Sequence, residues 1–118
     1  MFEINGYTIT LTRGDSAPIQ LIPTVLATGQ PYVFQEGDAV KFRIRQLPDC
    51  GAVLEWDGYI DTSDNSCVVT IHPEDTYDLE MTEYRYEAEL IDANGGHYTF
   101  IANQKFIIGK ELENHVNG

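Results

Sequence analysis

The sequence predicts an all-β protein, an antiparallel β-sandwich of about seven strands. Apolar and polar residues alternate with a period of two along most of the chain, as in strands that bury one face. Turn-forming residues separate the alternating segments at short intervals, and only one segment has the features of a helix. With 118 residues, 42% of them hydrophobic, the chain is long enough to build the core of one domain.

The first two expected strands cover residues 7–12 and 17–21, on either side of Arg13-Gly14-Asp15. This tripeptide occurs in extracellular ligands of integrins, but glycine followed by aspartate is also typical of a turn. Because strands flank it and no secretory signal precedes it, we favour the turn. Pro18 has no backbone N–H, so we expect the second strand to lie at a sheet edge.

The third strand is expected over residues 39–47, with Lys41, Arg43 and Arg45 on its outer face. Residues 48–51 break it, and a weaker fourth strand follows over residues 52–60. The fifth strand covers residues 67–71.

Residues 73–79 are the one segment that we predict as a helix, of a single turn. Proline suits the first helical position, and Glu74 and Asp75 interact favourably with the helix dipole. The sixth strand covers residues 84–90, and Asn-Gly within residues 92–96 predicts a hairpin to the seventh. That last strand, over residues 98–108, should bury Tyr98, Phe100 and Ala102 and carry a bulge near residues 103–104.

Seven short strands with almost no helix are typical of an immunoglobulin-like sandwich. Tyr84 and Tyr86 open the sixth strand, where a tyrosine corner occurs in that fold, although both also suit a core position. If the third and sixth strands are neighbours, the three basic residues face Glu83, Glu87 and Glu89. We assign residues 1–109 to the sandwich and residues 110–118 to a polar tail.

Seven basic and nineteen acidic residues give a net charge of −12. Such a charge repels phosphate backbones and anionic lipids, so we expect neither nucleic acid nor membrane as a partner. The start of the chain has no features of a secretory signal, which favours synthesis in the cytoplasm. Cys50 and Cys67 are expected to be reduced thiols, with Cys67 in the core.

No arrangement of residues indicates catalysis, and we expect neither enzymatic activity nor a cofactor. The acidic residues within 57–65 lack the spacing of an EF-hand loop, and His72 beside Glu74 and Asp75 lacks paired zinc ligands. A calcium-stabilised adhesin repeat is the interpretation that these acidic residues leave open.

Five residues are candidates for an interaction surface. Tyr32, Val33 and Phe34 are expected to be exposed in a loop, where they could mediate oligomerisation or assembly. Trp56 and Tyr59, together with Tyr32, are candidate stacking platforms for a carbohydrate. The alternative is that these aromatic residues belong to the core.

A resemblance to a known family rests on five segments, residues 8–15, 36–42, 71–76, 84–90 and 98–101, and extends from about Thr8 to Ile108. These segments resemble small prophage proteins encoded beside tail-fibre genes, which are similar to the amino-terminal β-sandwich of phage baseplate upper proteins. It implies a structural part of a phage tail or baseplate that links a fibre or receptor-binding component to the particle. Its implied partners are other tail proteins and copies of itself, with assembly into the virion. A carbohydrate-binding or host-surface-binding module is the alternative.

Overall fold

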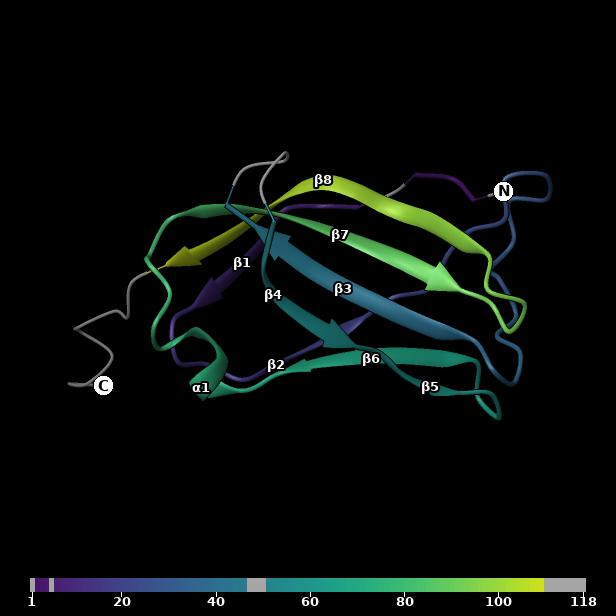
Figure 1. Cartoon of the computed structure of the whole chain (residues 1–118), viewed down its shortest axis with the longest axis horizontal. Coiled ribbons are helices and arrows are strands. Elements are labelled where there is room, and N and C mark those ends of the chain that lie inside the picture. The colour runs from purple at the N-terminus through teal and green to yellow at the C-terminus, as the bar shows by residue number, and fades with distance from the viewer. Residues whose placement is uncertain (1, 5, 47–50, 110–118) are drawn as a thin grey trace.

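The computed structural model describes residues 2–4, 6–46 and 51–109, which form two facing β-sheets and one helical turn (Figure 1). The strands are β1 (Ile9–Thr12), β2 (Ala17–Gln20), β3 (Ala39–Arg45), β4 (Ala52–Asp57), β5 (Tyr59–Asp61), β6 (Ser66–Ile71), β7 (Glu83–Ile91) and β8 (His97–Gly109), and the helical turn is α1 (Pro73–Thr76). One sheet has the order β1-β8-β7-β3-β4, and the other has the order β2-β6-β5. The all-β prediction is confirmed.

Inward-facing residues of both sheets form the core. In β3 the buried residues Val40, Phe42 and Ile44 alternate with basic residues, as predicted. The Phe42 ring stacks on Tyr86 of β7 at a centroid distance of 5.2 Å and meets Phe106 of β8 at 6.1 Å. Buried aromatic side chains contribute much of the hydrophobic stabilisation of such a core.

The structure splits the expected fourth strand in two, so the described residues form eight strands instead of about seven. β4 belongs to the first sheet and β5 to the second, and Gly58 lies between them. Its N–H donates to the Val40 carbonyl at 2.8 Å. A Cβ atom on Gly58 would lie 2.5 Å from Cys67 Sγ and 3.2 Å from Val40 Cβ. Only glycine therefore allows the chain to change sheets so close to the core.

One strand pair departs from the antiparallel prediction. Residues 2 and 3 contact residues 24 and 25, beyond β2, through a Phe2–Val25 bridge and a Glu3 N–H bond to the Thr24 carbonyl at 2.9 Å. The chain then reaches the larger sheet, where β1 pairs with β8 in parallel, Ile9 opposite Phe106. The amino-terminal segment thus contacts the loop beyond β2 and the edge of the larger sheet.

The predicted hairpin and bulge are present in β7 and β8. The Asp92 N–H donates to the Gly96 carbonyl at 2.9 Å and closes the turn. Between the pairs Tyr86–Gln104 and Ala88–Ile101 an extra residue of β8 is inserted, and Asn103 has a φ of 52°. A second register shift, between Ala88–Ile101 and Glu89–Thr99, inserts Phe100, and here two consecutive residues, Phe100 and Ile101, are buried. Tyr98 and Ala102 are only half-buried.

Ion pairs connect strands on the outer face of the larger sheet. β3 pairs with β7, and Arg43 contacts Glu87 at 3.3 Å and Glu89 at 3.1 Å. Arg45 contacts Glu87 at 2.7 Å. The prediction is wrong for Glu83, which contacts Arg85 and Lys105 because β3 ends opposite Arg85. Lys41–Asp57 and Arg43–Glu55 connect β3 to β4. His97 Nδ1 of β8 also lies 3.2 Å from Glu89 Oε2.

Both tyrosines at the start of β7 are core residues, and each hydroxyl group binds the backbone. Tyr84 donates to the Glu80 carbonyl at 3.0 Å, four residues upstream. Tyr86 donates to the Tyr7 carbonyl at 2.6 Å and accepts from the Tyr7 N–H at 3.2 Å. Tyr86 therefore fixes the segment that precedes β1.

Cys67 is buried in the core as predicted, and burial raises the pKa of its thiol to about 11. A thiol with such a pKa is protonated and unreactive at neutral pH. Cys50 and the predicted tail, residues 110–118, lie outside the described residues.

Replacing Glu87 by Gln should reduce stability in a pH-dependent way. The hydrogen bond from Arg45 holds the pKa of the Glu87 carboxyl below its ordinary value, and Arg43 adds to this effect. The resulting stabilisation is complete above the unfolded-state pKa, about 4.3, and is lost as pH falls through the folded-state pKa. After allowance for solvent screening, Glu87→Gln should lower the free energy of unfolding by about 0.5 kcal/mol at neutral pH.

Urea denaturation at neutral pH and at about pH 3 measures this difference. Glu36→Gln is the matched control, because it removes the same charge from an exposed residue that has no ion pair among the described residues. Equal effects of the two substitutions at both pH values would contradict the assignment of this stabilisation to the ion pairs of Glu87.

Replacing Gly58 by Ala should destabilise the protein by about 1–3 kcal/mol, because the new Cβ overlaps Cys67 Sγ. The double variant with Cys67→Ala should recover part of this loss, which a double-mutant cycle by thermal or urea unfolding measures. Gly51→Ala is the control, since a Cβ there meets no atom of the described residues within 4 Å. Additive effects of the two substitutions would show that the close contact is not the cause.

Candidate interaction surface

The predicted loop residues 32–34 do not form one exposed patch. Phe34 is only 3% exposed, so its expected place on the surface is wrong, whereas Val33 is 62% exposed. The Asn65 side chain causes this arrangement: its Oδ1 accepts from the Phe34 N–H at 2.8 Å, and its Nδ2 donates to the Tyr32 carbonyl at 3.1 Å. These bonds fix the loop with Phe34 in the core.

Tyr32 is half-buried, and both its hydroxyl and its ring have partners. Its hydroxyl donates to Asp38 Oδ2 at 2.8 Å, and its ring packs edge-on against Phe2 at 5.3 Å and Phe34 at 5.6 Å. Burial, followed by the bond to Asp38, raises the Tyr32 pKa to about 12. Tyr32 therefore stabilises the loop and presents little free ring surface.

Trp56 and Tyr59 lie on strands of different sheets and differ in exposure. The Trp56 ring packs on Phe42 at 5.6 Å, and its Nε1 donates to Asp75 Oδ2 at 3.1 Å. Tyr59, on β5, is 73% exposed. Of the five predicted surface residues, only Val33 and Tyr59 are therefore largely exposed.

The Arg13-Gly14-Asp15 tripeptide forms the turn between β1 and β2, as predicted. The Asp15 N–H donates to the Thr12 carbonyl at 3.0 Å, and Gly14 adopts a φ of 87°, which a type II turn requires. The Gly14 N–H also donates to Oγ1 of Thr76 at 2.9 Å, and Thr76 is fully buried in α1. The turn is thus anchored to the helical turn.

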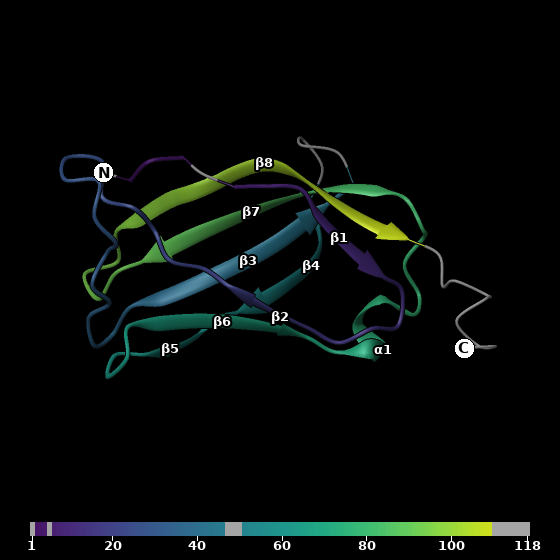
Figure 2. The same cartoon turned by 180° about the vertical axis from the view of Figure 1, so that it is seen from behind.

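A second surface lacks charged residues, and this feature can be read directly from the sequence. Residues 4–12 and 16–35 include no Asp, Glu, Lys or Arg, although the chain carries a net charge of −12. They supply β1 and β2, which are edge strands of opposite sheets and lie on the same side of the molecule (Figure 2). We call residues 6–9 and 19–23, together, the uncharged edge.

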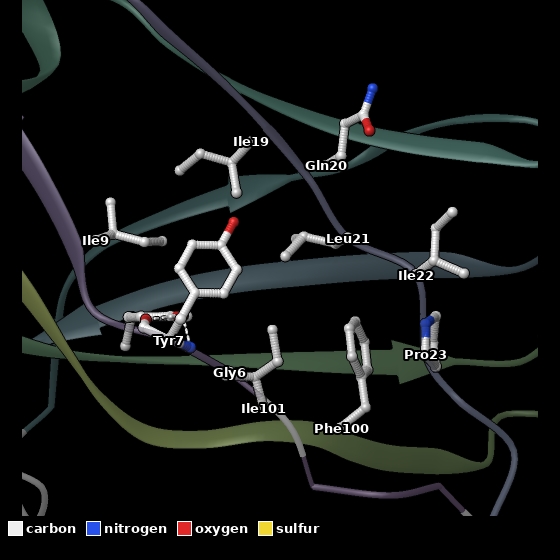
Figure 3. A pocket seen from close by; sticks show the side chains of 11 residues that line it. Gly6, Tyr7, Ile9, Ile19, Gln20, Leu21, Ile22, Pro23, Phe100 and Ile101 are labelled. Carbon is white, nitrogen blue, oxygen red and sulfur yellow. Dashed lines mark hydrogen bonds between the residues drawn. The ribbon is translucent and has the colours of Figure 1, made fainter. Parts of the chain in front are cut away.

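The uncharged edge surrounds a partly open groove of about 130 Å³ between the two sheets (Figure 3). Ile19, Leu21 and Ile22 of β2 and the segment after it line the groove, together with Tyr7 of the segment before β1 and with Phe100 and Ile101 of β8. No residue lining the groove is charged. Tyr7 is 63% exposed and Ile22 is 43% exposed, so apolar side chains extend from the groove to the solvent.

Gly6 permits the close approach of the segment before β1 to β8. It has a φ of 146°, and a Cβ there would lie 2.6 Å from the Gln104 side chain and 2.9 Å from the Ile101 side chain. Together with the Tyr86 hydroxyl, which binds the Tyr7 backbone, Gly6 sets the position of the groove wall. An apolar group suits the groove best, because most of the lining side chains are apolar and none is charged.

Within the described part of the chain, no three His, Cys, Asp or Glu side chains gather as a metal site. No helix there is long and apolar enough to cross a membrane. No protein-family model matches the chain, and no curated protein is significantly similar to it. The uncharged edge is therefore the surface on which a functional proposal rests.

Proposed function

We propose that the protein is a non-enzymatic assembly module of a phage tail or baseplate, which links a fibre or receptor-binding component to the particle. The uncharged edge is the observation that carries the proposal. Monomeric soluble proteins rarely combine an unprotected strand edge with neighbouring exposed apolar side chains, and such surfaces are typical of interfaces. The phage context rests on the resemblance of segments between Thr8 and Ile108 to small prophage proteins, as argued from the sequence alone.

The fold that we propose for this module is immunoglobulin-like. In that fold two sheets contain the strands B, E and D on one side and G, F, C and C′ on the other. The order β2-β6-β5 corresponds to the first set, and β8-β7-β3-β4 corresponds to the second. The bond from Tyr84 to the Glu80 carbonyl corresponds to a tyrosine corner.

The proposed partners are other tail or baseplate proteins, and the proposed route is synthesis in the bacterial cytoplasm followed by assembly into the virion. The net charge of −12 argues against nucleic acid and anionic membranes as partners. It also keeps the unassembled chain soluble, although its uncharged edge is exposed.

Binding of a carbohydrate or host surface is the alternative. It is supported by Tyr59, whose ring is largely exposed on β5. Stacking on sugars usually needs a broad aromatic surface, and Trp56 does not extend it because its ring packs on Phe42. Assembly therefore accounts for more of the observed surface.

Purified phage particles provide the test. After prophage induction in the bacterium that encodes the chain, particles separated on a density gradient should contain it in a fixed ratio to other tail proteins, measured by quantitative mass spectrometry. Deletion of its gene should yield particles that lack a tail component. Finding the chain only in the soluble fraction, with particles unchanged by the deletion, would contradict the assembly role.

Isothermal titration with purified cell-wall polysaccharide distinguishes carbohydrate binding from the assembly role. Assembly predicts no heat of binding. Heat that is lost in Tyr59→Ala but retained in Tyr77→Ala, a comparably exposed tyrosine outside the predicted surface, would favour carbohydrate binding.

A further inference from the structure

The outer edge of β2 has unpaired backbone groups. Ala17 and Ile19 pair with Ile71 and Val69 of β6, and the Leu21 N–H continues this ladder to the Cys67 carbonyl at 2.9 Å. In an antiparallel ladder the intervening residues point their backbone groups to the other side. The Gln20 N–H and the carbonyls of Gln20 and Pro18 therefore point away from β6, without a partner among the described residues.

Little protects this edge against the addition of another strand. Natural proteins shield such edges with charged residues, prolines, bulges or a covering segment. Pro18 removes one donor, but residues 16–35 contain no charged side chain. The edge is thus open to backbone pairing on the side where the apolar groove lies.

The groove is large enough for one side chain. Its volume of about 130 Å³ is close to the roughly 150 Å³ of an apolar cavity that holds one benzene molecule. A Leu or Phe side chain presented by an extended segment on β2 would therefore fill it. Filling the groove would also cover Ile22, which is now partly exposed.

Charge identifies the occupant as a different protein and not a second copy. Five of the seven basic residues already form ion pairs on the outer face of the larger sheet: Lys41, Arg43, Arg45, Arg85 and Lys105. The acidic residues elsewhere leave a strongly negative field, which repels a second copy and attracts a cationic segment.

We propose that the uncharged edge is a strand-addition site for an extended segment of a partner protein. The segment has alternating apolar residues, one bulky side chain that enters the groove, and Lys or Arg residues at its ends. Its backbone pairs with Gln20 and with the Pro18 carbonyl, in the manner of peptides that extend a sheet edge. This inference rests on the proposed assembly function and specifies the chemistry of the partner.

A synthetic peptide tests the proposal with the full chain. The probe has alternating Thr and Val residues around one central Phe, with two lysines at each end, and its affinity is measured by isothermal titration. Ile22→Lys should weaken binding at least about tenfold, because it places a cation at the groove. Val53→Lys is the matched control and should change binding less than about twofold, since Val53 is 40% exposed on β4 and receives the same charge.

The probe itself supplies two further controls. Replacing its central Phe by Ala should weaken binding at least about tenfold, and N-methylation of its central amides should do the same by removing backbone donors. Circular dichroism melts of both protein variants show whether each remains folded. No binding of the peptide, or equal weakening by the two lysine substitutions, overturns the proposal.

Analytical ultracentrifugation tests whether a second copy of the chain covers the edge instead. Self-association of the wild-type chain that Ile22→Lys abolishes would show that a second copy covers the edge, and it would overturn the partner assignment. The peptide titration and the detection of the chain in phage particles are independent measurements. Presence in particles without peptide binding would therefore overturn this inference alone, and peptide binding without presence in particles would overturn only the assembly role.

Discussion

Tyr86 connects the core of the sandwich to its uncharged edge, and the candidate surface depends on this connection. Its ring stacks on Phe42 and meets Phe106 edge-on at 6.3 Å, so it cannot move without disturbing the core. Its hydroxyl holds the backbone of Tyr7 by two hydrogen bonds. Burial raises the pKa of Tyr86, which keeps the hydroxyl protonated and able to donate. The segment that closes one side of the groove is therefore positioned by the most deeply packed part of the molecule.

The distribution of charge divides the surface into two regions with different roles. On the outer face of the larger sheet, ion pairs such as Arg43–Glu89 connect neighbouring strands and contribute modestly to register and stability. On the uncharged edge no such pairs compete with an incoming strand. Concentrating the cations on one face leaves the remaining surface acidic, which would favour the basic partner that we propose for the edge.

Local patterns predicted the strands but not the features that require contacts between distant residues. Alternation in β3 and β7, the turn at Gly14 and the hairpin at Asp92 depend on neighbouring residues, and all were predicted correctly. The break at Gly58 could not be predicted, because its cause is the approach of Val40 and Cys67. The burial of Phe34 depends likewise on Asn65, far along the chain. The charge-free residues 16–35 were visible in the sequence, but their meaning requires β1 and β2 to lie at adjacent sheet edges.

On our proposal, the β2 edge is open in the free chain and becomes paired in the assembled state. The backbone amide of Gln20 reports this directly, because it points away from β6 and has no partner among the described residues. Hydrogen exchange at Gln20 should be fast in the isolated protein and strongly slowed in purified particles, while exchange in the central strand β3 remains slow in both. Equally fast exchange of the Gln20 amide in the particle and in the free chain, with new protection on β4 or β5 instead, would contradict pairing at the β2 edge.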